Sequence, residues 1–194
     1  MLKKLTLIAA SFASAFALNS VEINVNDKDL EGAISIDMSQ LNDTIEPDTV
    51  FIGARILHAD KENSDFTTAA EMDDYYEVSF LMKRDFSHNL EIGLGMKLNG
   101  AKNFASIPLG GEARYALDTE LPMYLGGSIY FAPSVLAMRD AKSFMEYRLT
   151  LDIEVIENAM ITLGYRSLDT NYDKPVVRDV NYNSSFYAGL KFKF

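Results

Sequence analysis

The sequence of 194 residues contains no cysteine and only two histidines, His58 and His88. The absence of cysteine excludes disulfides and cysteine-ligated zinc or iron–sulfur sites, and two histidines are too few for a histidine-rich metal centre. No apolar run reaches the roughly 20 residues that a transmembrane helix needs. Basic residues are also scarce, since 18 Lys and Arg stand against 28 Asp and Glu, giving a net charge of −10. This balance disfavours nucleic-acid binding, which requires basic patches.

The first residues resemble a secretory signal peptide. Two lysines near the start precede an apolar stretch at 5–12, and the small residues Ala15 and Ala17 fit a small-x-small cleavage site. The alternative interpretation is a first amphipathic helix of the domain. We predict that 1–17 is a signal peptide and that 18–194 forms one exported domain, which would be periplasmic, secreted or inserted in an outer membrane.

Apolar and polar residues alternate along most of the chain after this segment. In the stretch NLEIGLGMKLN at 89–99, aliphatic residues occupy every second position, and glutamate, glycine, lysine and asparagine lie between them. This period of two predicts strands, because a helical period of 3.6 would scatter the charges around the helix. Ten segments share the pattern, at 21–26, 33–39, 49–58, 75–86, 89–99, 105–117, 123–131, 143–157, 159–168 and 184–194.

The connections between the predicted strands alternate in length from the third strand onward. Short connections lie at 87–89, 118–121 and 157–159. Longer polar connections lie at 59–74, around Lys102, at 133–142 and at 169–183. Short turns on one side and long loops on the other are typical of an outer-membrane barrel. The predicted fold class is therefore all-β, a closed antiparallel transmembrane β-barrel of about ten strands, or alternatively eight, in an up-and-down meander.

The last predicted strand, SSFYAGLKFKF, has two faces of opposite character. One face is apolar and carries Phe186, Leu190, Phe192 and Phe194. The other face is basic and carries Lys191 and Lys193. Lipid outside and a polar lumen inside would accommodate both faces, provided that the sheet closes so that every backbone polar group in hydrocarbon is paired. The competing interpretation is a soluble lipocalin-like barrel with its apolar face inward. That barrel would have to enclose many large side chains.

Charged residues on the polar faces of the predicted strands are nearly balanced in sign. Because burying an unpaired charge is costly, we expect an ion-pair network that fills a narrow lumen. Its predicted members are Arg55, Glu77, Lys83, Glu91, Lys97, Glu112, Arg114, Glu146, Arg148, Asp152, Glu154 and Arg166. Side chains can still fill a barrel of this size, so we expect no porin-like conduction. A narrow channel for small polar solutes is the alternative.

The end of the sequence resembles the signal that the outer-membrane assembly machinery recognises, a glycine followed by an aromatic-x-aromatic ending. Its residues here are Gly189, Phe192 and Phe194, and Ala188 departs from the polar residue that usually precedes the glycine. The stretches at 108–117, 130–136, 164–173 and 185–194 resemble the YfaZ family of outer-membrane proteins. This resemblance covers most of the second half of the chain. It implies an outer-membrane barrel and implies no activity.

Three segments suggest more specific hypotheses. The acidic run at 58–76 is interpreted as a solvated loop, with divalent-cation bridging to lipopolysaccharide as the sharper hypothesis. A lipid A or phospholipid hydrolase is another alternative, with His58 and Ser64 as candidate base and nucleophile. No G-x-S-x-G motif supports it. The segment at 132–144 is expected to form a short helical turn at the rim of the barrel.

The sequence thus predicts a monomeric barrel in a bacterial outer membrane with a non-enzymatic structural or interaction role in the envelope. We predict no catalytic, cofactor-binding or metal-ligating residues. The expected partners are outer-membrane lipid, lipopolysaccharide and the outer-membrane assembly machinery, and no nucleic acid.

Overall fold

The computed structural model describes residues 19–27, 29–59, 74–102, 104–172 and 180–194. These residues form strands and two short 3-10 helices, η1 and η3. The elements are β1 (Ser20–Val25), β2 (Asp29–Asp37), η1 (Met38–Gln40), β3 (Val50–Ala59), β4 (Tyr75–Ser87), β5 (Leu90–Ala101), β6 (Phe104–Ser106), β7 (Leu109–Leu117), β8 (Met123–Ala132), η3 (Ser134–Leu136), β9 (Ala137–Arg139), β10 (Ala141–Ile156), β11 (Ala159–Tyr172) and β12 (Val180–Lys193). Within this part of the chain, no helix is long and apolar enough to cross a membrane.

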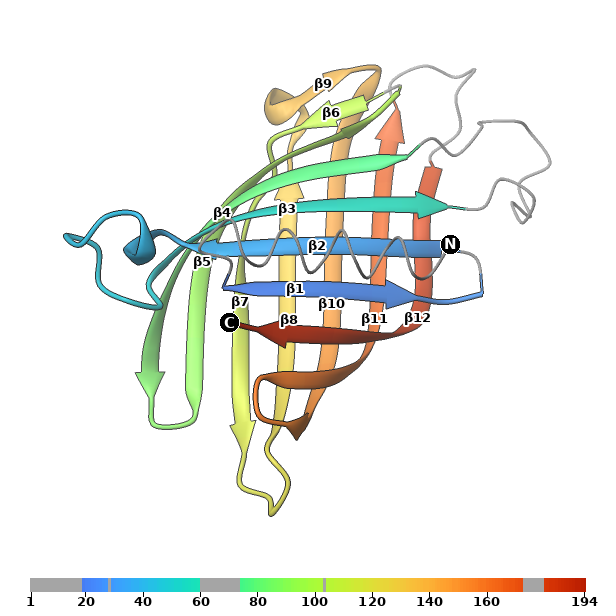
Figure 1. Cartoon of the computed structure of the whole chain (residues 1–194). Helices are drawn as coiled ribbons and strands as arrows, with labels where there is room; N and C mark the ends of the chain where they lie inside the picture. Colours follow the sequence, from blue (N-terminus) through green and yellow to red (C-terminus); the bar gives the residue numbers. More distant parts are fainter. Residues whose placement is uncertain (1–18, 28, 60–73, 103, 173–179) are drawn as a thin grey trace.

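Ten of the strands form a closed antiparallel barrel (Figure 1). Each pairs with the next along the chain in the order β1-β2-β3-β4-β5-β7-β8-β10-β11-β12. The first and last strands close the ring, with Ser20 opposite Lys193 and Val25 opposite Ala188. The prediction of a ten-stranded up-and-down barrel is confirmed, and the eight-stranded alternative is wrong.

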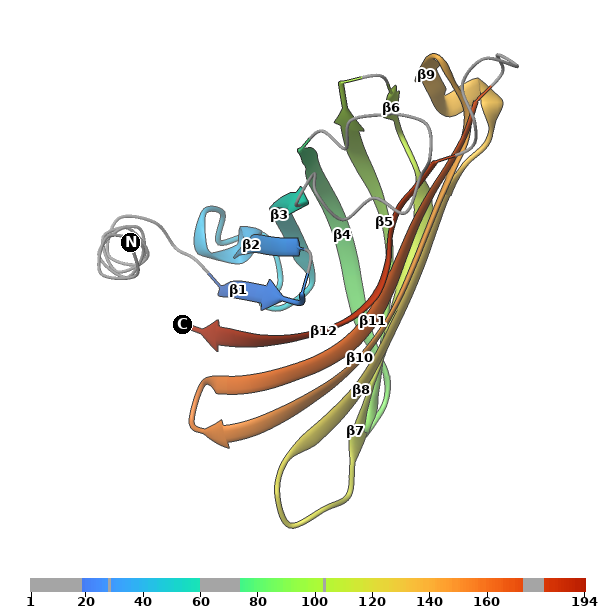
Figure 2. The same cartoon turned by 90° about the vertical axis from the view of Figure 1, so that its right-hand side faces the viewer.

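The barrel has two ends that differ in their connections (Figure 2). At one, the turn end, the connections at 88–89, 118–122 and 157–158 are short. At the opposite end, the loop end, the connection between β8 and β10 contains η3 and β9. Most of the connection predicted at 59–74 and the middle of the one predicted at 169–183 lie outside the described residues. One connection at the turn end is longer, at 38–49. Asp37 holds this segment together by accepting hydrogen bonds from the backbone N–H of Ser39 at 2.9 Å and of Asp48 at 2.8 Å.

Several predicted strands have different bounds in the structure; the strands predicted at 159–168 and 184–194, for example, span Ala159–Tyr172 and Val180–Lys193. The segment predicted as one strand at 105–117 is split into β6 and β7 at Pro108, which has no backbone N–H to donate. Both parts pair with β5, but β6 has β9 as its second neighbour and β7 has β8. The strand predicted at 33–39 begins earlier, at Asp29.

The side chains alternate between the two faces of the barrel wall as expected for strands. Aliphatic side chains lie on the outside, where Leu94 is 70% exposed and Leu149 is 61% exposed. Charged side chains lie inside, where Glu31 and Glu146 are fully buried. The outward aliphatic rows and inward ionic rows are therefore as predicted, and the lipocalin-like alternative with an apolar interior is wrong.

Other predicted segments are only partly described. The predicted helical turn at 132–144 is confirmed as η3, whose Leu136 packs against buried apolar residues while Val135 is exposed. The predicted signal peptide at 1–17 lies outside the described residues and stays a prediction. Most of the acidic run, at 60–73, also lies outside them, so the cation-bridging hypothesis stays a prediction.

Candidate functional site

The lumen is the candidate functional site, because the polar faces of all ten barrel strands converge there. From the loop end to the turn end it contains three zones, which we name the apolar layer, the ion cluster and the vestibule. Each zone brings together residues from strands that are far apart in the sequence and face one another across the lumen, such as Glu31 of β2 and Arg148 of β10.

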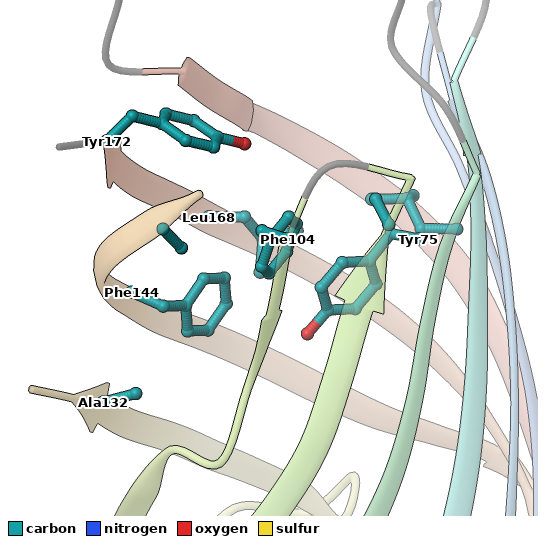
Figure 3. Packing of buried hydrophobic residues seen from close by; sticks show 9 residues of the cluster. Tyr75, Phe104, Ala132, Phe144, Leu168 and Tyr172 are labelled. Carbon is teal, nitrogen blue, oxygen red and sulfur yellow. The ribbon is translucent and has the colours of Figure 1, made fainter. Parts of the chain in front are cut away.

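The apolar layer lies at the loop end (Figure 3). Its residues are Leu57, Tyr75, Ala101, Phe104, Ala132, Ala141, Phe144, Leu168 and Tyr172. The rings of Phe104 and Phe144 stack with centroids 5.6 Å apart, and the Tyr75 ring lies 6.3 Å from each. These three side chains are at most 1% exposed, so aromatic rings from β4, β6 and β10 pack together inside the barrel.

The ion cluster lies directly beneath the apolar layer and consists of eight charged side chains. They are Asp29, Glu31, Arg55, Glu77, Lys97, Glu146, Arg148 and Arg166. Four cations and four carboxylates make the cluster electrically neutral. Neutrality matters here because desolvating a charge is compensated only by close partners of opposite sign.

Glu31 is the centre of one half of the ion cluster. Both of its oxygens accept hydrogen bonds from Arg148 at 2.8 Å, in the bidentate geometry that is strongest for an arginine–carboxylate pair. Arg166 Nη1 lies 2.9 Å from Glu31 Oε2, and Arg55 Nη1 lies 3.7 Å from it. One buried carboxylate from β2 therefore faces three guanidinium groups from β3, β10 and β11.

Glu146 and Glu77 form the other half of the ion cluster around Arg55 and Lys97. Arg55 Nη1 lies 2.8 Å from Glu146 Oε1, and Arg55 also donates to Glu77. Lys97 Nζ lies 2.9 Å from Glu146 and 3.4 Å from Glu77. Because Arg55 reaches all three central carboxylates, the eight residues form one connected network across the lumen.

Tyr75 joins the apolar layer to the ion cluster. Its ring belongs to the aromatic stack, while its hydroxyl donates to Glu77 Oε2 at 2.7 Å and accepts from Asn99 Nδ2 at 2.9 Å. Ser106 in turn donates to Asn99 Oδ1. This chain of hydrogen bonds satisfies the polar groups at the boundary, as buried polar groups require.

The vestibule occupies the turn-end half of the lumen and has a volume of about 510 Å³. Its base is formed by the ion cluster through Arg55 and Arg148, and its lining extends to Asn158 and Lys193 at the turn end. Small inward residues, including Gly126 and Ser128, leave this space open. A polar cavity thus reaches from the turn end to the middle of the barrel.

The predicted network residues fall into two groups. Six of them lie in the ion cluster: Arg55, Glu77, Lys97, Glu146, Arg148 and Arg166. The other six lie nearer the turn end, outside the cluster: Lys83, Glu91, Glu112, Arg114, Asp152 and Glu154.

The contacts of this second group are more local. Lys83 and Glu91 pair at 3.1 Å, and Arg114 Nη2 lies 3.9 Å from Asp152. Glu112 accepts from the Tyr130 hydroxyl at 2.8 Å. Glu154 accepts a backbone hydrogen bond from Asn158 at 3.4 Å, in the turn after β10.

Sequence reasoning missed the central carboxylate of the cluster. Glu31 and Asp29 fall before the start of the second predicted strand, because Gly32 interrupts its aliphatic row. The signal was present, since Asp29, Glu31 and Ala33 continue the inward positions with a period of two. The aromatic stack was also missed, because no local pattern shows that Phe104 and Phe144 meet.

The predicted assembly-signal residues occupy two environments on β12. Gly189 faces the lumen opposite Asn24, and a β-carbon there would overlap Asn24 Oδ1 and the Ile23 carbonyl oxygen. Phe192 and Phe194 are exposed on the outer surface. The packing supplies a structural reason for glycine at this position, and recognition by the assembly machinery stays a prediction.

The hydrolase alternative centres on His58. Its Nδ1 lies 2.5 Å from Asp74 Oδ1, and both side chains are largely exposed at the loop end. Ser64, the proposed nucleophile, lies outside the described residues. Within the described part of the chain, no hydroxyl group is hydrogen-bonded to His58, and no group of three or more acidic or histidine side chains is placed to hold a metal ion.

Comparison with known proteins identifies one family. The model of the family described as "YfaZ precursor" matches residues 4–194, nearly the whole chain. No curated protein matches the sequence. Among solved structures, a protein described as "KdgM porin" has 10% sequence identity and a TM-score of 0.45, covering 90% of this chain and 98% of that one. A "NanC porin" structure has 9% identity and a TM-score of 0.45, covering 92% of this chain and all of that one.

Proposed function

We propose that this chain, which belongs to the YfaZ family, is an integral outer-membrane barrel with a closed, side-chain-filled lumen. Its role would be structural or interactive within the bacterial envelope and would involve no catalysis. In this arrangement the short turns face the periplasm and the longer loops face outward. Outer-membrane lipid and lipopolysaccharide would be its surroundings, and the assembly machinery would recognise β12.

The outer surface supports membrane insertion. Exposed aliphatic side chains on neighbouring strands, such as Val78, Leu94, Ile129 and Leu149, would form a continuous apolar band. Water would make such a band unfavourable, whereas hydrocarbon favours it. Barrel closure also pairs the backbone groups of every strand in the ring, which the bilayer core requires.

The observation that carries a closed lumen is the stacking of two dense zones across it. The ion cluster is neutral and its central carboxylates are inaccessible, and the apolar layer above it is filled by three aromatic rings. An ion entering from the vestibule would have to separate paired charges and then cross an apolar barrier. These barriers support a lumen that does not conduct steadily.

Planar-bilayer recording of the refolded full-length protein tests this proposal. Insertion is first verified by the heat-dependent mobility shift of the folded barrel on gels and by protease protection. We expect inserted wild-type protein to show no steady conductance above that of protein-free bilayers. Steady single-channel currents from the inserted wild-type protein would overturn the closed lumen.

The vestibule favours a second candidate function, a narrow channel for small polar solutes. The cavity of about 510 Å³ already spans the turn-end half of the lumen, so only two zones separate it from the loop end. If the lumen is a channel, the wild-type protein should carry current in planar bilayers, and this current should fall in Ser128→Leu, whose larger side chain fills the vestibule. If the lumen is closed, neither protein should carry current.

A lipid hydrolase is the remaining alternative, and it has a separate test. Fatty-acid release from phospholipid or lipid A micelles would be compared for wild-type protein and His58→Ala. We expect no release above the detergent control from either protein. Release that is lost in His58→Ala would contradict the non-enzymatic proposal without bearing on whether the lumen conducts.

A further inference from the structure

The outer surface of the barrel changes from apolar to polar along β10, β11 and β12, which lie side by side (Figure 1). From the turn end to the loop end, the outward row on β11 is Ile161, Leu163, Tyr165, Ser167, Asp169 and Asn171. The register continues this change on both neighbours, since Ser143 of β10 lies opposite Asn171 and Ser184 of β12 lies opposite Ser167. On this wall the apolar band therefore ends well before the strands do.

Three aromatic side chains lie where this change occurs, and we name them the aromatic row. The Tyr165 ring lies between the other two, with its centroid 5.9 Å from that of Tyr147 and 5.0 Å from that of Phe186. The Tyr165 hydroxyl is hydrogen-bonded to Ser184 Oγ at 2.7 Å, on the polar side of the row. Aromatic residues gather at the boundary between hydrocarbon and water. In the proposed outer-membrane barrel, the aromatic row therefore marks the outer boundary of the hydrocarbon on this wall.

The side chains on the loop-end side of the aromatic row form a polar ladder, which consists of Ser143, Asp169, Asn171 and Ser184. Asn171 Nδ2 donates to Ser143 Oγ at 2.9 Å, and Ser167 donates to Asp169 Oδ2 at 2.8 Å. Hydroxyl, amide and carboxylate groups provide both donors and acceptors, which the hydroxyl groups of a sugar can match. The carboxylate of Asp169 accepts from neutral hydroxyl groups and repels a phosphate at close range. The polar ladder therefore suits a saccharide better than a phosphate headgroup.

On the turn-end side of the aromatic row, the outer surface carries an open groove of about 520 Å³ across β5, β7, β8 and β10. Its outward residues are Ile92, Leu94, Gly111, Ala113, Gly127, Ile129, Tyr147 and Leu149. The glycines and the alanine leave a hollow between the larger aliphatic side chains. Tyr147 belongs to both the groove and the aromatic row, so the groove reaches the boundary at which the polar ladder begins. Its apolar lining fits an acyl chain.

Gly127 is the residue whose small size depends least on the barrel wall itself. Its φ is not positive, so the backbone does not require glycine there. A β-carbon at this position would lie 3.5 Å from Leu149 Cδ2 and 3.9 Å from the Arg148 carbonyl oxygen, which are ordinary contact distances. Glycine inside a strand is destabilising and provides no side chain to pack. The structural consequence of glycine at this position is the depth of the groove.

We propose that the groove and the polar ladder together bind one lipopolysaccharide molecule, with an acyl chain in the groove and sugar hydroxyl groups on the ladder. The inference rests on the proposed function, because it requires the loop end to lie at the outer leaflet. It turns lipopolysaccharide from a general surrounding into a ligand of one wall of the barrel. The site lies outside the lumen, so it does not depend on whether the lumen conducts.

The chain contains no tryptophan, so a single introduced tryptophan reports lipid contact at one place. Phe131→Trp places it between the groove and the ladder, because Phe131 is exposed and lies opposite Met145, which lies opposite Asp169. The full chain is refolded into bilayers of brominated phosphatidylcholine, which quenches tryptophan fluorescence. Lipopolysaccharide or unbrominated phosphatidylcholine is then mixed into both leaflets. The recovery of fluorescence with mole fraction gives the relative affinity of the two lipids.

We expect Phe131→Trp to report a roughly tenfold preference for lipopolysaccharide, which corresponds to about 1.4 kcal/mol. The matched reporter is Phe80→Trp on β4, another exposed phenylalanine of the outer surface, which lies away from the groove and the ladder. It should report no preference between the two lipids. Since both leaflets contain both lipids, the result does not depend on the direction of insertion.

Two further variants, each combined with Phe131→Trp, test the two parts of the site. Gly127→Leu fills the groove, and Asn171→Ala removes the amide of the polar ladder. Each should reduce the preference by roughly threefold or more, the loss expected for one net hydrogen bond or its displacement. The matched control is Gly32→Leu on β2, at the opposite side of the ring, where a β-carbon would meet no atom within 4 Å. It should leave the preference unchanged.

Equal affinity for the two lipids at Phe131→Trp would overturn the site. So would a preference that either Gly127→Leu or Asn171→Ala leaves unchanged, or one that Phe80→Trp reports equally. Insertion is verified for every variant by the heat-dependent mobility shift. A wild-type chain that does not insert would contradict the proposed outer-membrane function itself, whereas an inserted barrel without lipid preference contradicts this inference alone.

Discussion

The two halves of the lumen share one barrel and one alternating pattern, yet they are filled in opposite ways. In the loop-end half, the inward positions carry large side chains that pack or pair, such as Phe104, Phe144 and Arg166. In the turn-end half, inward glycine and serine residues such as Gly126 and Ser128 leave a cavity. The difference shows that the alternation of polar and apolar residues along each strand decides which face of the wall is polar. The size of the inward-facing side chains decides whether the lumen is filled.

The same difference changes the energetic role of charge. In the ion cluster, the cations and carboxylates are almost completely removed from water, and most of them have several charged partners. In the vestibule, the Lys83–Glu91 pair keeps about a quarter of each side chain exposed. Water can replace a lost partner in the vestibule, whereas in the ion cluster it cannot.

The largest effect is expected from Glu31→Gln. The substitution keeps the shape of the side chain and removes the negative charge that faces Arg55, Arg148 and Arg166. Removing one partner of a buried ion pair costs about 3–5 kcal/mol, so the free energy of unfolding in urea should fall by that amount. The matched control is Glu154→Gln at the turn end, which should cost less than about 1 kcal/mol. Equal losses in the two variants would contradict the distinction between the halves.

The next effect is expected from Phe144→Ala in the apolar layer. Truncating a buried phenylalanine typically costs about 3–5 kcal/mol, and we expect a loss in that range because Phe144 is only 1% exposed. The control is Phe86→Ala, whose side chain is 75% exposed on the outer surface. Urea unfolding of both variants in the same lipid measures the difference. A smaller loss in Phe144→Ala than in Phe86→Ala would argue against a packed layer.

A pair of enlargements compares the filling of the two halves directly. Ser106 is fully buried and donates to Asn99, so Ser106→Leu should destabilise the barrel by about 2–3 kcal/mol through overpacking and a lost hydrogen bond. Ser128 lines the vestibule, where there is room for the added carbons. Ser128→Leu should therefore change the free energy of unfolding by less than about 1 kcal/mol. Similar costs would mean that the vestibule is not open space for side chains.

The smallest effect is expected from Lys83→Gln. A partly exposed ion pair contributes about 0–1 kcal/mol, and salt screens it. The loss of unfolding free energy should thus be within about 1 kcal/mol and should shrink further in high salt. Lys97→Gln in the ion cluster is the comparison, with a loss of several kcal/mol that salt changes little. A salt-sensitive loss in Lys97→Gln would place water in the cluster.

Much of the fold could be predicted because strand alternation is a local signal. The period of two is enough to identify the inward positions of Arg55, Glu77, Lys97, Glu146 and Arg148. Strand ends are less certain, and Glu31 was missed for that reason alone. Pro108 marks a break that the prediction of one continuous strand overlooked.

The partners within the lumen could not be predicted in the same way. Alternation states that Arg148 faces inward, but it cannot state that Arg148 reaches Glu31 across a sequence separation of 117 residues. Whether the two side chains meet across the lumen depends on strand register, barrel closure and stagger, which accumulate over ten strands. The aromatic stack between β4, β6 and β10 depends on the same quantities.

The amino-acid sequence by itself determined a barrel wall with apolar side chains outside and ionic ones inside, because each strand carries its own period of two. Only the tertiary structure decided that the loop-end half is dense and the turn-end half is hollow. The physical reason is that filling an enclosed space depends on which large and small side chains meet across it. These contacts across the lumen depend on the geometry of the whole closed ring of strands, which no single strand determines.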